Sequence, residues 1–134
     1  MSEYTEWDHK DEWRKRGSYF LVTVTRHNTV NNGNKWAVYC YLYPSHKLFS
    51  TFDGNNIYQP ATDVLPLHHG PSFLEYHRDD DGICSVQIGA DYTHIYDDRF
   101  MRYKNKPEAY EVFNDADILF NFLKKAGEQN EQIN

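Results

Sequence analysis

Residues 18–43 read SYFLVTVTRHNTVNNGNKWAVYCYLY, and this stretch decides the fold. Apolar and polar side chains alternate along 18–27 and again along 35–43. This is the period of a β-strand, and β-branched and aromatic residues dominate both runs. Between the runs, Asn32 and Gly33 tolerate the positive φ angles of a tight turn. The stretch therefore predicts a long β-hairpin.

Two further segments extend this hairpin into a sheet. Residues 72–78 and 83–91 flank a turn at 79–82 (Asp-Asp-Asp-Gly), which predicts a second hairpin. Between the two hairpins we expect a helical turn at 45–52 and a short helix at 57–65 that Pro60 interrupts.

The clearest helix signal lies at residues 114–126. Asn114 is a typical N-cap, and Phe113 before it is placed to pack against Ile118 as a hydrophobic staple. Gly127 marks the end of the helix. Apolar residues recur at helical spacing, so one face of this helix is expected to pack on the sheet.

These elements predict an α+β fold, a four-stranded and mostly antiparallel sheet with the C-terminal helix on one face. We expect an N-terminal arm or short helix (1–17), a single α+β domain (18–127) and a flexible tail (128–134). The other sheet face would expose three tyrosines in alternating register. This predicts a homodimer through Tyr39, Tyr41 and Tyr43.

The charge balance excludes several classes of function. The chain has 134 residues and a net charge of −6, whereas nucleic-acid and anionic-membrane binding need cationic surface. No apolar run approaches the ~20 residues of a membrane helix, and the first residues do not resemble a signal peptide. The two cysteines are too few for a disulfide scaffold. We therefore expect a cytoplasmic protein with no direct contact to nucleic acid or membrane.

Residues 75–98 hold seven acidic residues against one arginine, so this segment alone equals the net charge of the chain. We expect it to bind a host protein with a basic surface, the carboxylates steering association and the tyrosines anchoring it. The alternative is a solvated hairpin turn. The predicted partner-binding residues are Glu75, Asp79, Asp80, Asp81, Asp91, Tyr92, Tyr96, Asp97 and Asp98.

A second predicted surface overlaps the end of this segment, at residues 92–103, which contain several tyrosines and arginines. Such side chains stack on bases and hold phosphates, and the same types are hot spots of protein interfaces. The sequence leaves both interpretations open, so sequestration of a nucleotide or other small ligand is the alternative function. The candidate ligand-binding residues are Tyr92, Tyr96, Arg99, Arg102 and Tyr103.

The motifs argue against catalysis. No nucleophile elbow, Walker loop or dinucleotide-binding glycine pattern is present, and Cys40 and Cys84 are expected on buried strand faces. We predict a non-enzymatic protein with no cofactor. Histidines and carboxylates offer candidate metal ligands, and with them a metal-dependent hydrolase as a further alternative. The possible ligands are His68 and His69 in one loop, then Asp91, His94, Asp97 and Asp98. The hydrolase would use His68, His69, Asp91 and His94. Because adjacent histidines rarely ligate the same ion, we expect no metal there.

Three stretches resemble small uncharacterised proteins of bacteriophages and prophages. They are Arg26–Asn34 (RHNTVNNGN), Leu65–Gly70 (LPLHHG) and Val86–Tyr92 (VQIGADY), and the likeness spans roughly residues 18–123. The resemblance implies a virus-encoded cytoplasmic protein that acts on host machinery, such as an inhibitor of an antiviral defence system. It transfers no functional residue. The leading hypothesis is therefore a binding protein that inhibits a host protein.

Overall fold

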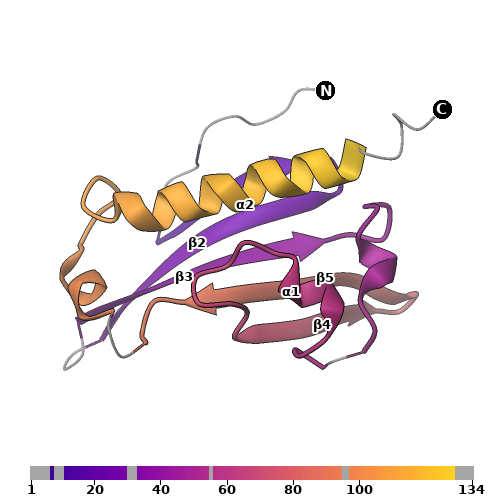
Figure 1. The fold of residues 1–134 in the computed structure, drawn as a ribbon, viewed down its shortest axis with the longest axis horizontal. Coiled ribbons are helices and arrows are strands. Elements are labelled where there is room, and N and C mark those ends of the chain that lie inside the picture. The colour runs from indigo at the N-terminus through magenta and orange to yellow at the C-terminus, as the bar shows by residue number, and fades with distance from the viewer. Residues whose placement is uncertain (1–6, 8–10, 30–32, 55, 95–96, 129–134) are drawn as a thin grey trace.

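The structure is a computed structural model, and it describes residues 7, 11–29, 33–54, 56–94 and 97–128 (Figure 1). Five strands form one antiparallel sheet in the order β1-β2-β3-β5-β4, so β3 is the central strand. The strands are β1 (Glu12–Gly17), β2 (Phe20–Thr29), β3 (Gly33–Leu42), β4 (Phe73–Asp79) and β5 (Gly82–Asp91). The helices are η1 (Phe49–Thr51), α1 (Pro60–Asp63), η2 (Asp98–Arg102) and α2 (Tyr110–Glu128). In these described segments, no helix is long and apolar enough to cross a membrane.

The α+β class, the antiparallel sheet and the C-terminal helix are confirmed. The first hairpin consists of β2 and β3. Their residues pair from Phe20↔Leu42 to Thr29↔Gly33, so both strands extend closer to the turn than predicted. Gly33 has a φ of 75°, which a side chain would strain. The alternation places Val22 and Val38 in the core, as the pattern requires.

The expectation of four strands is wrong, because Glu12–Gly17 forms β1 instead of an arm or short helix. Trp13, only 2% exposed, stacks on Trp36 at 5.5 Å and meets Phe113 of α2 edge-on. Lys15 reaches Asp117 of the same helix at 3.2 Å. A strand with one core tryptophan among charged residues has too few apolar positions to show its period, and the rest of the predicted arm, 1–6 and 8–10, lies outside the described residues.

The second hairpin is β4 and β5, and β5 pairs with β3. The crossover from β3 to β4 carries η1 within the predicted helical turn at 45–52 and α1 within the predicted helix at 57–65, each shorter than the predicted range. Pro60 begins α1 at its first position instead of interrupting a helix, because its missing N–H costs nothing there.

The C-terminal helix begins at Tyr110, earlier than predicted. Asn114 lies inside the helix and is exposed, so it is not the N-cap, and Ile118 is 48% exposed, so the predicted staple does not form. Instead, Asn105 Oδ1 accepts the N–H of Glu108 in the preceding turn. The helix covers β1, β2 and β3 on one face of the sheet (Figure 1). Its buried residues are Val112, Phe113, Ala116, Leu119, Phe120 and Leu123.

Candidate metal-binding site

Two loops meet beside the sheet and bring three histidines to one aspartate. The first loop follows Leu65, whose side chain is buried in the core. A turn then runs from Leu67 to Gly70 and is closed by the Gly70 N–H, which donates to the Leu67 carbonyl at 2.9 Å. His68 and His69 are the two central residues of this turn. Both imidazoles therefore project from its tip, and their ring centroids lie 4.2 Å apart.

His69 holds a backbone conformation that is unusual for its residue type. Its φ is 59°, in the left-handed region that glycine and asparagine favour. Such a conformation costs on the order of 1–3 kcal/mol and clusters at functional sites. The sequence analysis expected no metal because adjacent histidines rarely ligate the same ion, as successive side chains of an extended chain point apart. The turn removes that objection.

The second loop follows β5 and folds around Asp97. The Asp97 N–H donates to the His94 carbonyl at 2.9 Å, and Asp97 Oδ2 accepts the His94 N–H at 3.0 Å. Downstream, the Phe100 N–H donates to the Asp97 carbonyl, and Phe100 is buried. These contacts hold the Asp97 carboxylate inward, so that it is only 2% exposed.

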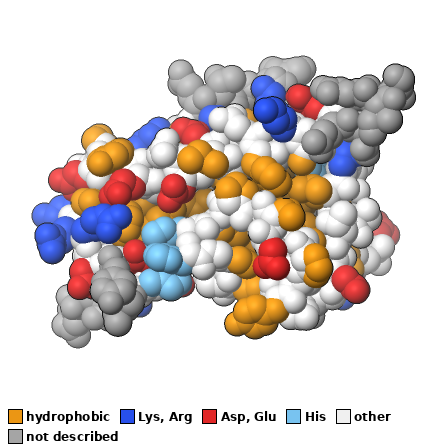
Figure 2. All heavy atoms as spheres, in the orientation of Figure 1, with side chains coloured by type: hydrophobic (Ala, Val, Ile, Leu, Met, Phe, Trp, Pro, Cys, Tyr) orange, Lys and Arg blue, Asp and Glu red, His pale blue; other side chains and the backbone are white. Residues whose placement is uncertain are grey.

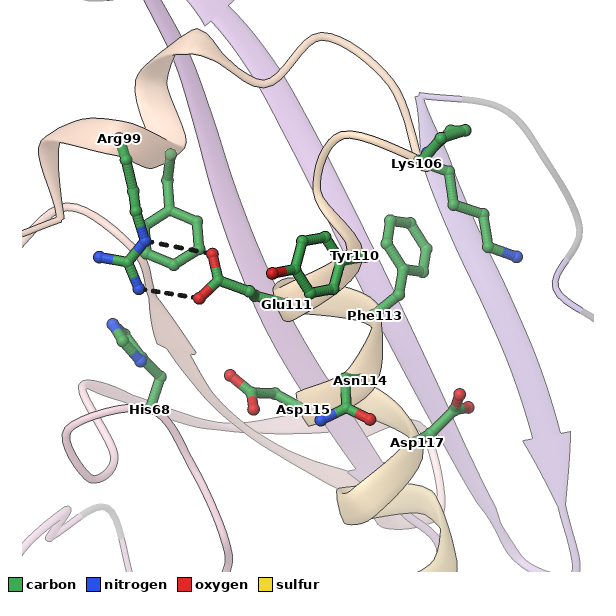
Figure 3. Close-up of a pocket in the computed structure, with 11 residues that line it drawn as sticks. His68, Arg99, Lys106, Tyr110, Glu111, Phe113, Asn114, Asp115 and Asp117 are labelled. Atoms are coloured by element: carbon green, nitrogen blue, oxygen red, sulfur yellow. Dashed lines mark hydrogen bonds and ion pairs between the residues drawn. The ribbon is translucent and has the colours of Figure 1, made fainter.

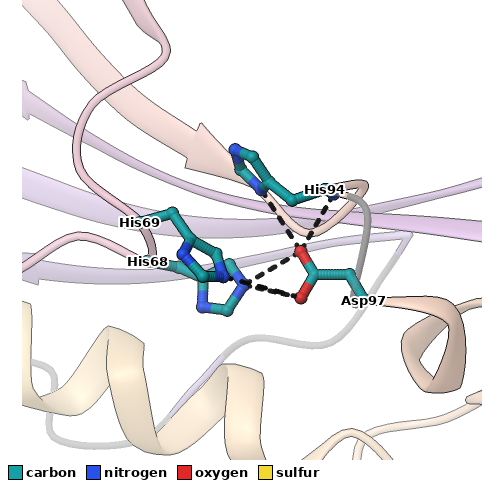
Figure 4. A group of neighbouring side chains, drawn as sticks. All are labelled: His68, His69, His94 and Asp97. Carbon is teal, nitrogen blue, oxygen red and sulfur yellow. Dashed lines mark hydrogen bonds and ion pairs between the residues drawn. The ribbon is translucent and has the colours of Figure 1, made fainter.

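The four side chains converge on one point (Figure 4). His68 Nε2 lies 3.0 Å from both oxygens of Asp97, and His94 Nδ1 lies 3.2 Å from Oδ2. His69 Nε2 lies 3.9 Å from Oδ1. One ligand atom from each residue lies within 4.8 Å of every other. A tetrahedral zinc site has bonds of about 2.0–2.1 Å and therefore ligand atoms about 3.3 Å apart, so small side-chain rotations would complete one here.

Asp97 is an ionised carboxylate in a buried position. Burial by itself raises its pKa, but hydrogen bonds from His68 and from the His94 backbone outweigh burial and hold the pKa below its usual value. Within the described part of the chain, the only side chains that lie within ion-pair distance of the Asp97 carboxylate are imidazoles. A carboxylate oxygen together with imidazole nitrogens is a donor set that suits zinc and other divalent first-row metals.

Tyr92 packs against the histidine cluster. Its ring stacks on His68 with centroids 4.2 Å apart, and its hydroxyl donates to Asp115 of α2 at 2.7 Å. Burial raises the pKa of Tyr92, and the bond to Asp115 raises it further, so the hydroxyl keeps its proton. A chain of contacts thus runs from α2 through Tyr92 to the first imidazole. Asp115 had no sequence signal, because nothing in a helix sequence shows which partner a carboxylate reaches.

The cluster is accessible from outside. The His69 side chain is 52% exposed and the His94 side chain 36% exposed. Histidine side chains form a continuous patch on the face shown in Figure 2, beside Lys or Arg and hydrophobic side chains. A metal ion can therefore reach the site without unfolding the protein.

Of the four residues predicted for the hydrolase, the structure brings three together and replaces the fourth. His68, His69 and His94 join the cluster, and Asp97 takes the place expected for Asp91. Asp91 Oδ1 lies 3.8 Å from His94 Nδ1 and accepts hydrogen bonds from Thr93. The sequence analysis named Asp97 as a possible ligand as well as part of the acidic surface, but the sequence could not show that Asp97, and not Asp91, meets the histidines.

The predicted acidic surface is not continuous. Tyr92 is 1% exposed and Asp97 is buried, so neither offers a contact surface, and Tyr96 lies outside the described residues. The accessible acids of this surface are spread along β5, a strand of ten residues and thus about 30 Å. Asp79, Asp80 and Asp81 lie at the turn before β5, Glu75 lies opposite Gln87 near the middle of the strand, and Asp91 and Asp98 lie at or beyond its end.

Several side chains of the predicted tyrosine and arginine patch contact other residues of the protein. A groove of about 940 Å³ beside His68 is lined by Arg99 and by the first turns of α2 (Figure 3). There, Arg99 forms a two-pronged ion pair with Glu111 at 3.0 and 3.1 Å, and the Tyr103 hydroxyl donates to the same carboxylate. This pairing lowers the pKa of Glu111. Arg102 is exposed on η2.

Comparison with known proteins does not assign the chain to a family. No protein-family model matches the chain, and no curated protein and no solved structure is significantly similar to it. The functional argument therefore depends on the residues themselves.

Proposed function

We propose that this protein binds one divalent transition-metal ion, Zn²⁺, through His68, His69, His94 and Asp97. The observation that carries the proposal is the convergence of four ligand atoms from two loops around a buried carboxylate. The strained backbone at His69 also supports the proposal. Glycine at this position would keep every hydrogen bond of the turn and would avoid the strain, so the turn by itself does not explain a histidine here.

The ligand count indicates what the ion would do. Four protein ligands fill a tetrahedral shell, as in structural zinc sites, whereas catalytic sites keep a position open for water. The ion would strengthen the link between the β3–β4 crossover and the loop after β5, which His68 and Asp97 already join by hydrogen bonds. This argues for metal binding that stabilises the fold and against the metal-dependent hydrolase as the first choice.

The test is titration of chelator-treated protein with ZnCl₂ by calorimetry, together with metal analysis of protein purified without chelator. We expect one Zn²⁺ per chain. His69→Ala removes an exposed ligand and should weaken binding at least about tenfold, on the order of the loss for one ligand or its support. His27→Ala is the matched control, because His27 is exposed on β2 and lies outside the cluster. No binding, or equal loss in both variants, would refute the proposal.

The exposed turn of the β4–β5 hairpin supports a second candidate function, the binding of a basic host protein by a phage-encoded inhibitor. Its three aspartates are exposed, and none of them forms an ion pair within the described segments. Unpaired carboxylates at a protruding turn are free to steer a cationic partner.

A further inference from the structure

The sheet has one face without a covering layer in the described part of the chain. Helix α2 and the crossover residues Phe52 and Leu65 join the core on the face that carries Val22, Val38 and Val86. On the opposite face, strand alternation places Tyr39 and Tyr41 of the central strand, both half-buried. We call this the open face.

The centre of the open face is aromatic and rigid. Tyr39 meets Phe73 edge-on at 5.4 Å, and Tyr41 stacks on His77 at 5.9 Å. Gly89 lies beneath Tyr39, where an added Cβ would come within 2.2 Å of that ring. The tyrosine therefore lies flat across the sheet, as an anchor at an interface does.

The two edges of the open face differ in charge, because β1 carries Arg14 and Arg16 with Glu12, whereas β4 carries Glu75. The strand register aligns one row across the sheet from Arg16 on β1, through Leu21, Tyr41 and Gln87, to Glu75 on β4. The next row begins at Arg14 and ends at Phe73. Arg16 and Glu75 are both exposed, and neither has an ion-pair partner within the described residues.

We propose that the open face binds a second copy of this chain, with the two sheets face to face about a two-fold axis parallel to β3. Because β3 is the central strand, this axis places β1 of one copy over β4 of the other. Arg16 then faces Glu75 of the second copy twice, once on each side of the axis, and Arg14 faces Phe73. A two-fold axis across the strands would instead stack β1 on β1 and oppose like charges.

The area is sufficient for a specific but reversible dimer. Five strands about 4.8 Å apart and six paired residues at about 3.3 Å give a face of about 24 by 20 Å. Two copies would bury about 1,000 Å² in total, the lower bound for a specific interface. Aligned sheet packing at about 10 Å separation allows arginine and glutamate side chains to meet across it.

The test is sedimentation equilibrium of the full chain from about 5 to about 500 μM, spanning the weak range expected for this area. We expect a monomer–dimer equilibrium with a Kd below about 100 μM. Arg16→Glu and Glu75→Arg each oppose like charges twice in a dimer, so each should raise the Kd at least about tenfold. Arg102→Glu, an exposed charge reversal on η2, should leave it unchanged.

Mixing the two single variants decides the geometry. In a mixed dimer, the carboxylate introduced by Arg16→Glu in one copy meets the guanidinium introduced by Glu75→Arg in the other. The remaining contact is the native pair, so equimolar mixing should restore dimerisation. Circular dichroism confirms that each variant is folded. A wild-type protein that stays monomeric throughout, or variants that mixing does not restore, would overturn the proposal.

Discussion

His69 has an exposed imidazole and a left-handed backbone conformation. Its effect on folding stability can therefore be measured separately from its effect on metal binding. The backbone strain at His69 disfavours the folded state, whereas its ring lies against His68 and His94 and comes only within 3.9 Å of Asp97. A residue kept for stability alone would be glycine or asparagine at this φ.

We predict that His69→Gly leaves the unfolding free energy of metal-free protein unchanged or higher, within about 1 kcal/mol, because relief of strain offsets the added freedom of the unfolded chain. The same variant should lose the stabilisation by Zn²⁺, which for wild type is ~2.7 kcal/mol at about 100 times the Kd. Urea denaturation with and without Zn²⁺ measures both. A loss of about 2 kcal/mol or more without metal would instead assign His69 a structural role.

At the scale of elements, the packing of α2 on the sheet depends on the face the helix presents. Leu119 is fully buried, whereas the neighbouring Ile118 is 48% exposed. Leu119→Ala should cost ~2–5 kcal/mol of unfolding free energy through the lost burial and the cavity left behind. Ile118→Ala should change it by less than about 0.5 kcal/mol. Thermal or urea denaturation compares them, and similar costs would contradict the observed helix face.

The end of α2 is joined to the chain after β3 through His46. Its Nε2–H donates to the Leu123 carbonyl at 3.0 Å, and its Nδ1 accepts the Leu48 N–H at 3.1 Å. Both ring nitrogens are thus used by the neutral imidazole. Burial lowers the pKa of His46 below its ordinary 6.5, although the bond to Leu123 partly opposes this.

Because the unfolded chain protonates His46 at a higher pH than the folded chain, this residue destabilises the fold in acid. Its contribution is fully present above about pH 6.5 and is lost as pH falls through the lower folded pKa. We expect the unfolding free energy of metal-free protein to decrease over this window, and to decrease less steeply in His46→Gln. Parallel pH profiles for the two proteins would assign the slope to other groups.

At the scale of the whole molecule, the exposed turn of the β4–β5 hairpin carries three of the acidic residues of segment 75–98, namely Asp79, Asp80 and Asp81. If the exposed turn steers a basic partner, Asp79→Asn, Asp80→Asn and Asp81→Asn combined should slow association with a partner captured from host lysate. The effect should shrink from about 50 to 500 mM salt, as screening shortens the field to a few Å. Unchanged association kinetics and salt response would leave these aspartates a solubilising role.

Much of the architecture could be predicted from the sequence. The two hairpins and the C-terminal helix have strong periodic patterns, and the turn residues between strands mark their limits. Strand β1 could not be predicted, because Trp13 is its only apolar core-facing side chain. Lys15, two residues later on the same face, is charged and so breaks the apolar alternation that marks a strand. The start of α2 was misplaced because an asparagine inside a helix has the same local signal as an N-cap.

The sequence by itself therefore determined the local structure and the types of side chain available: the hairpins, the helix, the open tyrosine face and a set of histidines with carboxylates. Only the tertiary structure decided which of these meet. A left-handed residue turned two adjacent imidazoles toward one point, and the loop after β5 buried Asp97 there while leaving Asp91 aside. Sequence patterns report the contacts of residues near in the chain. A site built from two loops depends on distances between residues far apart in the chain, and folding alone sets these.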